Sequence, residues 1–406
     1  MKKVLRKIHL WLSVPTGIII TLVCFSGAML VFEKEITEAI KPELYFVKEA
    51  KGEPIPMQQL MEKVEETLPD SVSISGVTVF ADSTRTYQVS LSKPRRASIY
   101  VNQYTGEVTG RSERLPFFNT MFHLHRWLLG SSSGVGKLLT GICTLVLVFI
   151  LITGILMWLT NRNKPLKASL AIHVTKGWGR FWHDLHVAGG IYTTIFLLAM
   201  ALTGLTWSFS WYRTGFYACF GVESSEKGGA HGEGGNSHGE GRGSRGEGRY
   251  THGDGRNNHE GKRGEGRGFH RRSPYRHWEN VLNEVALKNP GYQQITLKPE
   301  VAEVVPEGRL SMRAADKYSY DRRSGEITDV QLYSAGKKDT KVRSGVYMVH
   351  TGSWGGIITR ILNFLAAFIG ATLPLTVAIG YGSDASVQPL LITIRSLLFE
   401  SAQMCF

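Results

Sequence analysis

The sequence is poor in cysteine, and its four cysteines do not form a pattern. No Cys-x-x-Cys pair occurs, which argues against an iron–sulfur cluster or a zinc ribbon. The absence of Cys-x-x-Cys-His argues equally against covalent c-type haem. No glycine-rich dinucleotide fingerprint lies between a strand and a helix, so no nicotinamide or flavin site of that type is predicted.

Acidic residues are outnumbered, and the net charge is +13. The excess lies beside apolar runs and in a low-complexity segment, and not in a nucleic-acid-binding pattern, so no nucleic-acid partner is expected. The apolar runs themselves lack carboxylates and thiolate pairs. That absence disfavours a permease-like path for bare metal ions.

Four apolar runs are present, and each is long enough for a helix of roughly 20 residues to cross a bilayer. They cover residues 8–32, 138–160, 187–211 and 357–379. The first run is too long for a signal peptide and lacks a small-x-small cleavage site, so it is predicted to remain as a span. The chain is therefore expected to be a multi-pass membrane protein in contact with the lipid bilayer.

Lysine and arginine predict the orientation of these spans. The first seven residues and the short loop 161–182 are rich in both, and should be cytoplasmic. The N-terminus would then be cytoplasmic, and both long polar segments would lie on the periplasmic side of a bacterial inner membrane.

One histidine lies at the mouth of each span. His9 and His186 fall near the cytoplasmic face, and His125 and His350 fall near the outer face. A single such histidine would most simply contact lipid headgroups. Pairing by face and repetition along the chain instead favour axial ligation of haem iron. We expect two haem b groups, with iron held by His9 and His186 and by His125 and His350.

Three further histidines are weaker candidates. His123 and His183 precede better-placed histidines. They are expected to contact the haem propionates or the residues that support the ligands, or, as the favoured alternative, to be plain interface residues. His173, in the cytoplasmic loop, is expected to be solvated. No catalytic side chain is predicted. Small residues within the spans are expected to allow close helix packing, which would also leave room for a porphyrin; they include Gly17, Gly27, Gly189, Gly190 and Gly204.

The two polar segments repeat one pattern. Asn102-Gln-Tyr-Thr-Gly-Glu-Val108 and Asp321-Arg-Arg-Ser-Gly-Glu-Ile327 both predict a strand, a tight turn and a second strand. An amphipathic helix precedes each of these hairpins, beginning near Met57 and near Trp278. Further strands are expected at 73–80, 87–91, 293–297 and 310–314.

The predicted fold is a membrane all-α four-helix transmembrane bundle plus two small α+β PepSY-like extracytoplasmic domains. Its parts are transmembrane helix 1 (8–32), the first periplasmic domain (33–122), transmembrane helix 2 with its periplasmic lead-in (123–160), a cytoplasmic loop (161–182), transmembrane helix 3 (183–212), the second periplasmic domain (213–348), transmembrane helix 4 (349–380) and an atypical tail (381–406). A Gly/His-rich insertion at 223–272 is expected to be disordered.

These features carry a family resemblance. The two hairpins resemble the PepSY domain. The spans, with Lys-Ile-His9-Leu-Trp, Leu-His125-Arg-Trp-Leu, Asp-Leu-His186 and Val-His350-Thr-Gly, look like the PepSY-associated transmembrane helix family over about residues 3–380. The resemblance implies that these four histidines bind b-type haem, and that the chain is similar to inner-membrane ferrisiderophore reductases.

The expected function is therefore that of a haem b-containing oxidoreductase. Electrons would come from a quinol or a cytoplasmic reductase and would reduce a ferric siderophore or another ferric chelate in the periplasm. The alternative is a PepSY-type regulatory or protease-inhibiting membrane protein without redox activity. That alternative leaves the pairing of the histidines unexplained.

Overall fold

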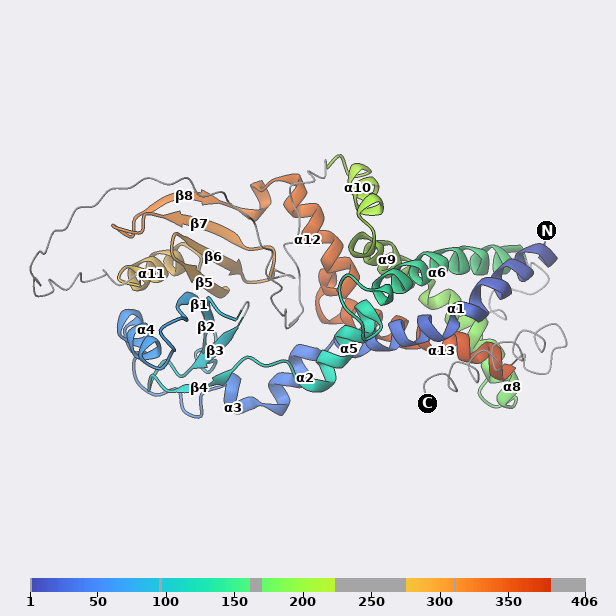
Figure 1. Cartoon of the computed structure of the whole chain (residues 1–406), viewed down its shortest axis with the longest axis horizontal. Coiled ribbons are helices and arrows are strands. Elements are labelled where there is room, and N and C mark those ends of the chain that lie inside the picture. The colour runs from blue at the N-terminus through green and yellow to red at the C-terminus, as the bar shows by residue number, and fades with distance from the viewer. Residues whose placement is uncertain (1, 95–96, 161–169, 223–274, 310–311, 381–406) are drawn as a thin grey trace, which may run out of the picture.

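The computed structural model describes residues 2–94, 97–160, 170–222, 275–309 and 312–380. A helical bundle forms one end of the elongated molecule and a β-sheet with its helices forms the other (Figure 1). The predicted disordered insertion at 223–272 and the tail at 381–406 lie outside the described residues.

The predicted spans are confirmed as helices. Within the described part of the chain, four stretches are long and apolar enough to cross a membrane, namely Lys3–Leu30, Val135–Thr160, Trp178–Ser208 and Ser353–Thr376. Their elements are α1 (Lys2–Leu30), α6 (Val135–Thr160), α8 (Trp178–Asp184) continued by the π-helical turn η1 (Leu185–Gly189) and α9 (Gly190–Ser208), and α13 (Gly356–Gly380). The chain is thus a multi-pass membrane protein.

The four spans form a closed ring. Helix α1 packs against α6 and α13, and α9 packs against the same two helices. Helices α1 and α9 therefore face each other across the bundle, as do α6 and α13. Small residues allow the close approach, since a Cβ at Gly370 would lie only 2.8 Å from the Leu197 side chain.

Short helices join the bundle to the sheet. They are α2 (Glu33–Ile40), α3 (Pro42–Tyr45), α5 (Pro116–Trp127), α10 (Ser210–Ala218) and α12 (Lys338–Thr351), with the 3₁₀ turns η2 (Tyr333–Ala335) and η3 (Ser353–Gly355). Helices α5 and α12 each lead into a span through a tight turn. Leu128 and Leu129 have φ values of 47° and 67°, which are unusual for residues with a branched side chain. The second turn uses Gly352, with φ of 76°.

The strands of both polar segments form a single antiparallel sheet. They are β1 (Ile74–Phe80), β2 (Tyr87–Leu91), β3 (Ser98–Val101), β4 (Val108–Arg111), β5 (Tyr292–Lys298), β6 (Val301–Pro306), β7 (Asp316–Tyr320) and β8 (Ile327–Gln331). Their order is β4-β3-β2-β1-β5-β6-β7-β8. The central pair, β1 and β5, joins the two halves, with Val77 opposite Leu297 and Val79 opposite Ile295. Both polar segments therefore lie on the same side of the bundle.

The two faces of this sheet differ. One face is covered by α4 (Met57–Glu66) and α11 (Trp278–Lys288), and their apolar side chains form the main core with the inward-facing strand residues. The other face points toward the bundle (Figure 1) and is largely polar. Thr78 and Thr296 lie on it with their hydroxyl oxygens 2.9 Å apart.

Most of the predicted local structure is confirmed, including both amphipathic helices and both hairpins. The strand predicted at 310–314 is wrong. Residues 312–314 form a turn and a bend between β6 and β7, and Met312 is 48% exposed. The prediction failed because the apolar side chain of Met312 fits the sequence pattern of a buried strand residue. The sequence also gave no sign that the two expected domains share one sheet.

Candidate functional site

The four span-mouth histidines form two pairs of neighbouring rings. The ring centres of His9 and His186 are 6.3 Å apart, with the ring planes at 89°. Those of His125 and His350 are 6.1 Å apart, with the planes at 55°. We call His125 and His350 the sheet-side pair, because they lie at the end of the bundle next to the sheet, and His9 and His186 the distal pair.

Each pair spans the bundle between helices that face one another. His9 comes from α1 and His186 from the π-helical turn that begins the third span. Such turns occur often at functional sites, since the extra residue re-aims a side chain. His125 and His350 lie in the last turns of α5 and α12, immediately before α6 and α13. The four-fold positional pattern in the sequence thus becomes two pairs in space.

In the distal pair, each Nδ1 atom has a hydrogen-bond partner on an adjacent helix of the bundle. His9 Nδ1 lies 3.0 Å from Thr153 Oγ1. His186 Nδ1 lies 2.8 Å from Thr376 Oγ1 and 3.2 Å from the Leu373 carbonyl. Both threonine hydroxyls donate to backbone carbonyls of their own helices. They can therefore accept from Nδ1–H, which leaves Nε2 unprotonated and able to bind a metal.

The sheet-side pair follows the same rule. His125 Nδ1 lies 2.8 Å from the Val23 carbonyl. His350 Nδ1 lies 2.9 Å from the Met200 carbonyl and 3.2 Å from Thr203 Oγ1. A carbonyl can only accept, so Nδ1 carries the proton in both rings and Nε2 again presents its lone pair.

The Ser/Thr-Gly steps of the spans support the histidines. A Cβ at Gly27 would lie 2.8 Å from His125 Cε1, and one at Gly204 would lie 3.1 Å from His350 Cε1. The corresponding distance from Gly154 to His9 Cε1 is 3.5 Å. Each of these glycines follows a hydroxyl residue. Thr153 and Thr203 also bond the His9 and His350 rings, whereas the Ser26 hydroxyl bonds carbonyls of its own helix. From the sequence these glycines were expected to allow helix packing and to leave room for a porphyrin, and the structure adds their close approach to the histidine rings.

Each histidine pair borders a cavity. The sheet-side cavity has a volume of about 1220 Å³ and is lined by His125 and His350. The distal cavity has a volume of about 500 Å³ and is lined by His9 and His186. Cys24, Leu147 and Leu197 line both cavities, so only one layer of side chains separates them.

The other candidate histidines have different surroundings. His183 lines the distal cavity, and its Nδ1 lies 3.4 Å from Asp184 Oδ1. His123 packs against Trp127, with ring centres 4.9 Å apart, and is absent from the lining of both described cavities. His173 is partly exposed, with 30% of its side-chain surface accessible, and its Nδ1 lies 2.8 Å from Asp184 Oδ2. Sequence reasoning missed this buried aspartate, which also accepts a hydrogen bond from Arg180.

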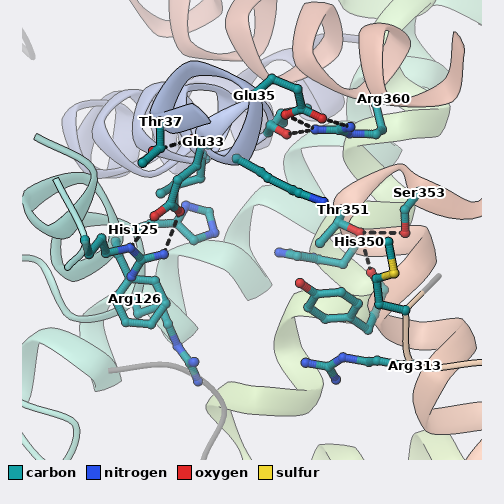
Figure 2. Close-up of a pocket in the computed structure, with 18 of the residues that line it drawn as sticks. Glu33, Glu35, Thr37, His125, Arg126, Arg313, His350, Thr351, Ser353 and Arg360 are labelled. Atoms are coloured by element: carbon teal, nitrogen blue, oxygen red, sulfur yellow. Dashed lines mark hydrogen bonds and ion pairs between the residues drawn. The ribbon is translucent and has the colours of Figure 1, made fainter. Parts of the chain in front are cut away.

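Three ion pairs hold α2 at the rim of the sheet-side cavity. Glu33 pairs with Arg114, Glu38 with Arg85, and Glu35 with Arg360 of α13. Arg360 donates to Glu35 over 2.8 Å, and this hydrogen bond lowers the pKa of the Glu35 carboxyl. Figure 2 shows this pair above the cavity, with His125 and Arg126 on one side and His350 and Arg313 on the other.

The geometry of both pairs fits a haem iron. A metal–imidazole bond is about 2 Å long and the ring centre lies about 1 Å beyond the nitrogen, so two axial imidazoles place their centres about 6 Å apart. Among the described residues, no group of three or more His, Cys, Asp or Glu side chains could hold a metal ion. Two imidazoles alone suit a metal whose remaining positions are filled by a macrocycle.

The sequence of the chain matches the PepSY-associated TM region family over residues 6–380. The chain belongs to this family. The match covers all four spans and the sheet, so the resemblance seen in the hairpins and span motifs is confirmed at the level of the family. No curated protein matches the chain.

Proposed function

We propose that this PepSY-associated membrane protein carries one b-type haem at each histidine pair and passes single electrons across the membrane. The observation that carries the proposal is the repetition of one geometry, with ring centres 6.1 Å and 6.3 Å apart and Nδ1 hydrogen-bonded in all four rings. When bound, haem would supply one-electron redox chemistry, because axial histidines on both sides leave no open iron position for oxygen.

The residues of the chain provide the setting for that chemistry. Thr153, Thr203 and Thr376 hold imidazoles in the tautomer that binds iron. Cys24 and Leu197 fill the wall between the cavities with apolar atoms. Two redox centres separated by one packed layer can exchange electrons without moving parts.

Electrons would pass from the predicted cytoplasmic end of the bundle to the end beside the sheet. The predicted cytoplasmic end would accept electrons from a quinol or a cytoplasmic reductase. The sheet side would reduce a ferric siderophore or another ferric chelate, so that each electron leaving the protein converts one ferric ion to a ferrous ion. This activity would make the chain an oxidoreductase of iron acquisition in the inner membrane of a bacterium.

The electron-transfer step can be tested in nanodiscs. The protein is reduced with dithionite, freed of reductant, and mixed without oxygen with a ferric siderophore in the presence of a ferrous-specific chelator. We expect the reduced-haem absorbance to disappear while one ferrous ion forms per haem. His350→Ala should abolish this reaction. A haem-loaded protein that stays reduced beside every ferric chelate would refute the reductase activity.

A further inference from the structure

The two cavities can be compared directly, because the repeat gives each a histidine pair of the same geometry. This inference rests on the proposed function, in which both pairs hold the same group. The distal cavity measures about 500 Å³ and the sheet-side cavity about 1220 Å³. The difference of about 720 Å³ falls within the roughly 300–1,000 Å³ that ligand sites occupy. The sheet-side cavity therefore has room for a second ligand that the distal cavity lacks.

The larger cavity also has the larger excess of positive charge in its lining. The distal cavity is lined by two arginines, Arg6 and Arg180, against the single carboxylate of Asp184. The sheet-side cavity is lined by eight lysines and arginines against four glutamates. The excess of basic residues is thus one in the distal cavity and four in the sheet-side cavity. Identical haems cannot account for the difference, which points to an additional anionic ligand.

The wall of the sheet-side cavity opposite the histidines supplies hydrogen-bonding groups. It is the polar face of the sheet, to which Gln88 of β2, Tyr100 of β3 and Gln294 of β5 contribute. Gln88 is directly opposite Tyr100 in the register of β2 and β3. The amides of Gln88 and Gln294 can donate to oxygen atoms of a ligand. Because β2 and β5 come from different halves of the chain, the wall requires the shared sheet.

Arginine side chains also line this cavity. Arg313 lines the cavity, and its guanidinium carbon lies 3.7 Å from the centre of the Tyr347 ring. Arg309, which also lines the cavity, lies 3.5 Å from Asp316. In Figure 2 Arg313 projects from the side of the cavity that carries His350. A ligand seated here would meet positive charge on its way to the sheet-side pair.

We infer that the space between the polar sheet face and the sheet-side histidine pair is the acceptor site, and that it selects anionic, oxygen-rich ferric chelates over neutral or cationic ones. Arg313 and Gln294 are assigned as binding residues, one for charge and one for hydrogen bonding. The site allows the chelate to approach the sheet-side pair directly, so the electron leaves the protein without a further carrier.

The test uses redox-inert gallium(III) chelates, which report binding without reduction. The haem-loaded protein is titrated by calorimetry with a gallium tris-catecholate complex, which is anionic, and with the gallium complex of desferrioxamine B, which is cationic. We expect the anionic complex to bind at least about tenfold more tightly and to weaken as salt is raised. Arg313→Gln should weaken it about tenfold, and Gln294→Ala about threefold.

Two matched controls lie away from the cavity. Arg323→Gln changes a residue of the hairpin turn between β7 and β8, and Gln59→Ala changes an exposed glutamine of α4 on the opposite face of the sheet. Both should leave the affinity unchanged. Equal affinity for the two complexes, or unaltered affinity in both Arg313→Gln and Gln294→Ala, would overturn the site. The visible spectrum of each sample separates this failure from that of the proposed function, which would appear as an absence of haem.

Discussion

The glycines against the histidine rings allow a graded test of the haem-binding geometry. Replacing Gly27 by alanine adds one methyl group, which would lie 2.8 Å from His125 Cε1 and 3.0 Å from its Nδ1. The ring cannot simply move away, because its Nδ1 is bound to the Val23 carbonyl over 2.8 Å. Overpacking of this kind costs about 1–3 kcal/mol. The affinity of the sheet-side pair for haem should therefore fall about 5- to 150-fold.

The same substitution at two other glycines shows how haem loss depends on the distance between the added methyl group and the histidine ring. The methyl group would lie 3.1 Å from the His350 ring in Gly204→Ala and 3.5 Å from the His9 ring in Gly154→Ala, and the second distance is an ordinary contact. The loss of haem should decrease in the order Gly27, Gly204, Gly154. Alanine is a better helix former than glycine by about 1 kcal/mol, so unfolding of the helix does not explain such a loss.

The assay is the haem-to-protein ratio of purified variants, with the chemical haem assay and a redox titration on each sample. Gly27→Ala should fall toward one haem per chain and should lose the component of the titration that His350→Ala also removes. Gly154→Ala should keep both haems. Full haem content in Gly27→Ala, or a greater loss in Gly154→Ala, would refute the assignment of these glycines.

Two further predictions concern the hydrogen bonds of the site and its rim. Thr376→Val removes the 2.8 Å partner of His186 Nδ1 and makes the imidazole less basic, so the potential of the distal haem should rise by about 20–60 mV. Thr372→Val, on the same helix but bonded only to its own backbone in the described structure, should leave the potential unchanged, and an equal shift in both variants would contradict the prediction. The lowered pKa of Glu35 means that its pair with Arg360 stabilises the fold above the ordinary carboxyl pKa of 4.5, and that this contribution disappears as the pH falls through the lowered value. Since the Glu35 side chain is 46% exposed, Glu35→Gln should lower the free energy of unfolding by less than about 1 kcal/mol at neutral pH. Thermal unfolding at acid pH should show no difference, whereas a loss of packing would lower the stability at both pH values. Glu66→Gln on α4 is the control.

Hydrophobic length and local periodicity were enough to predict much of the fold. The spans are recognisable because a bilayer demands about 20 apolar residues, and no other element among the described residues meets that demand. The helices at Met57 and Trp278 and the two Gly-Glu hairpins follow from period and turn chemistry. These are local signals, and each can be read without knowledge of distant residues.

The features that could not be predicted depend on distant contacts. The pairing of β1 with β5 joins residues far apart in the chain, and each strand alone has the pattern of an ordinary half-buried strand. The histidine pairs were predicted from topology, whereas their threonine partners were not, because Thr153 and Thr376 differ in no local way from other span threonines. The buried Asp184 was missed for the same reason, since its partner His173 belongs to a segment that looks like a solvated loop.

The central claim, two haems held by two histidine pairs, is tested most directly by the visible spectrum of the purified protein. The protein is extracted in detergent from a haem-sufficient host, and spectra are recorded as isolated and after dithionite, together with the haem content per chain. We predict two b-type haems with six-coordinate spectra, and the loss of one in His9→Ala and of the other in His350→Ala. A colourless preparation, or an unchanged haem content in both variants, would contradict the claim.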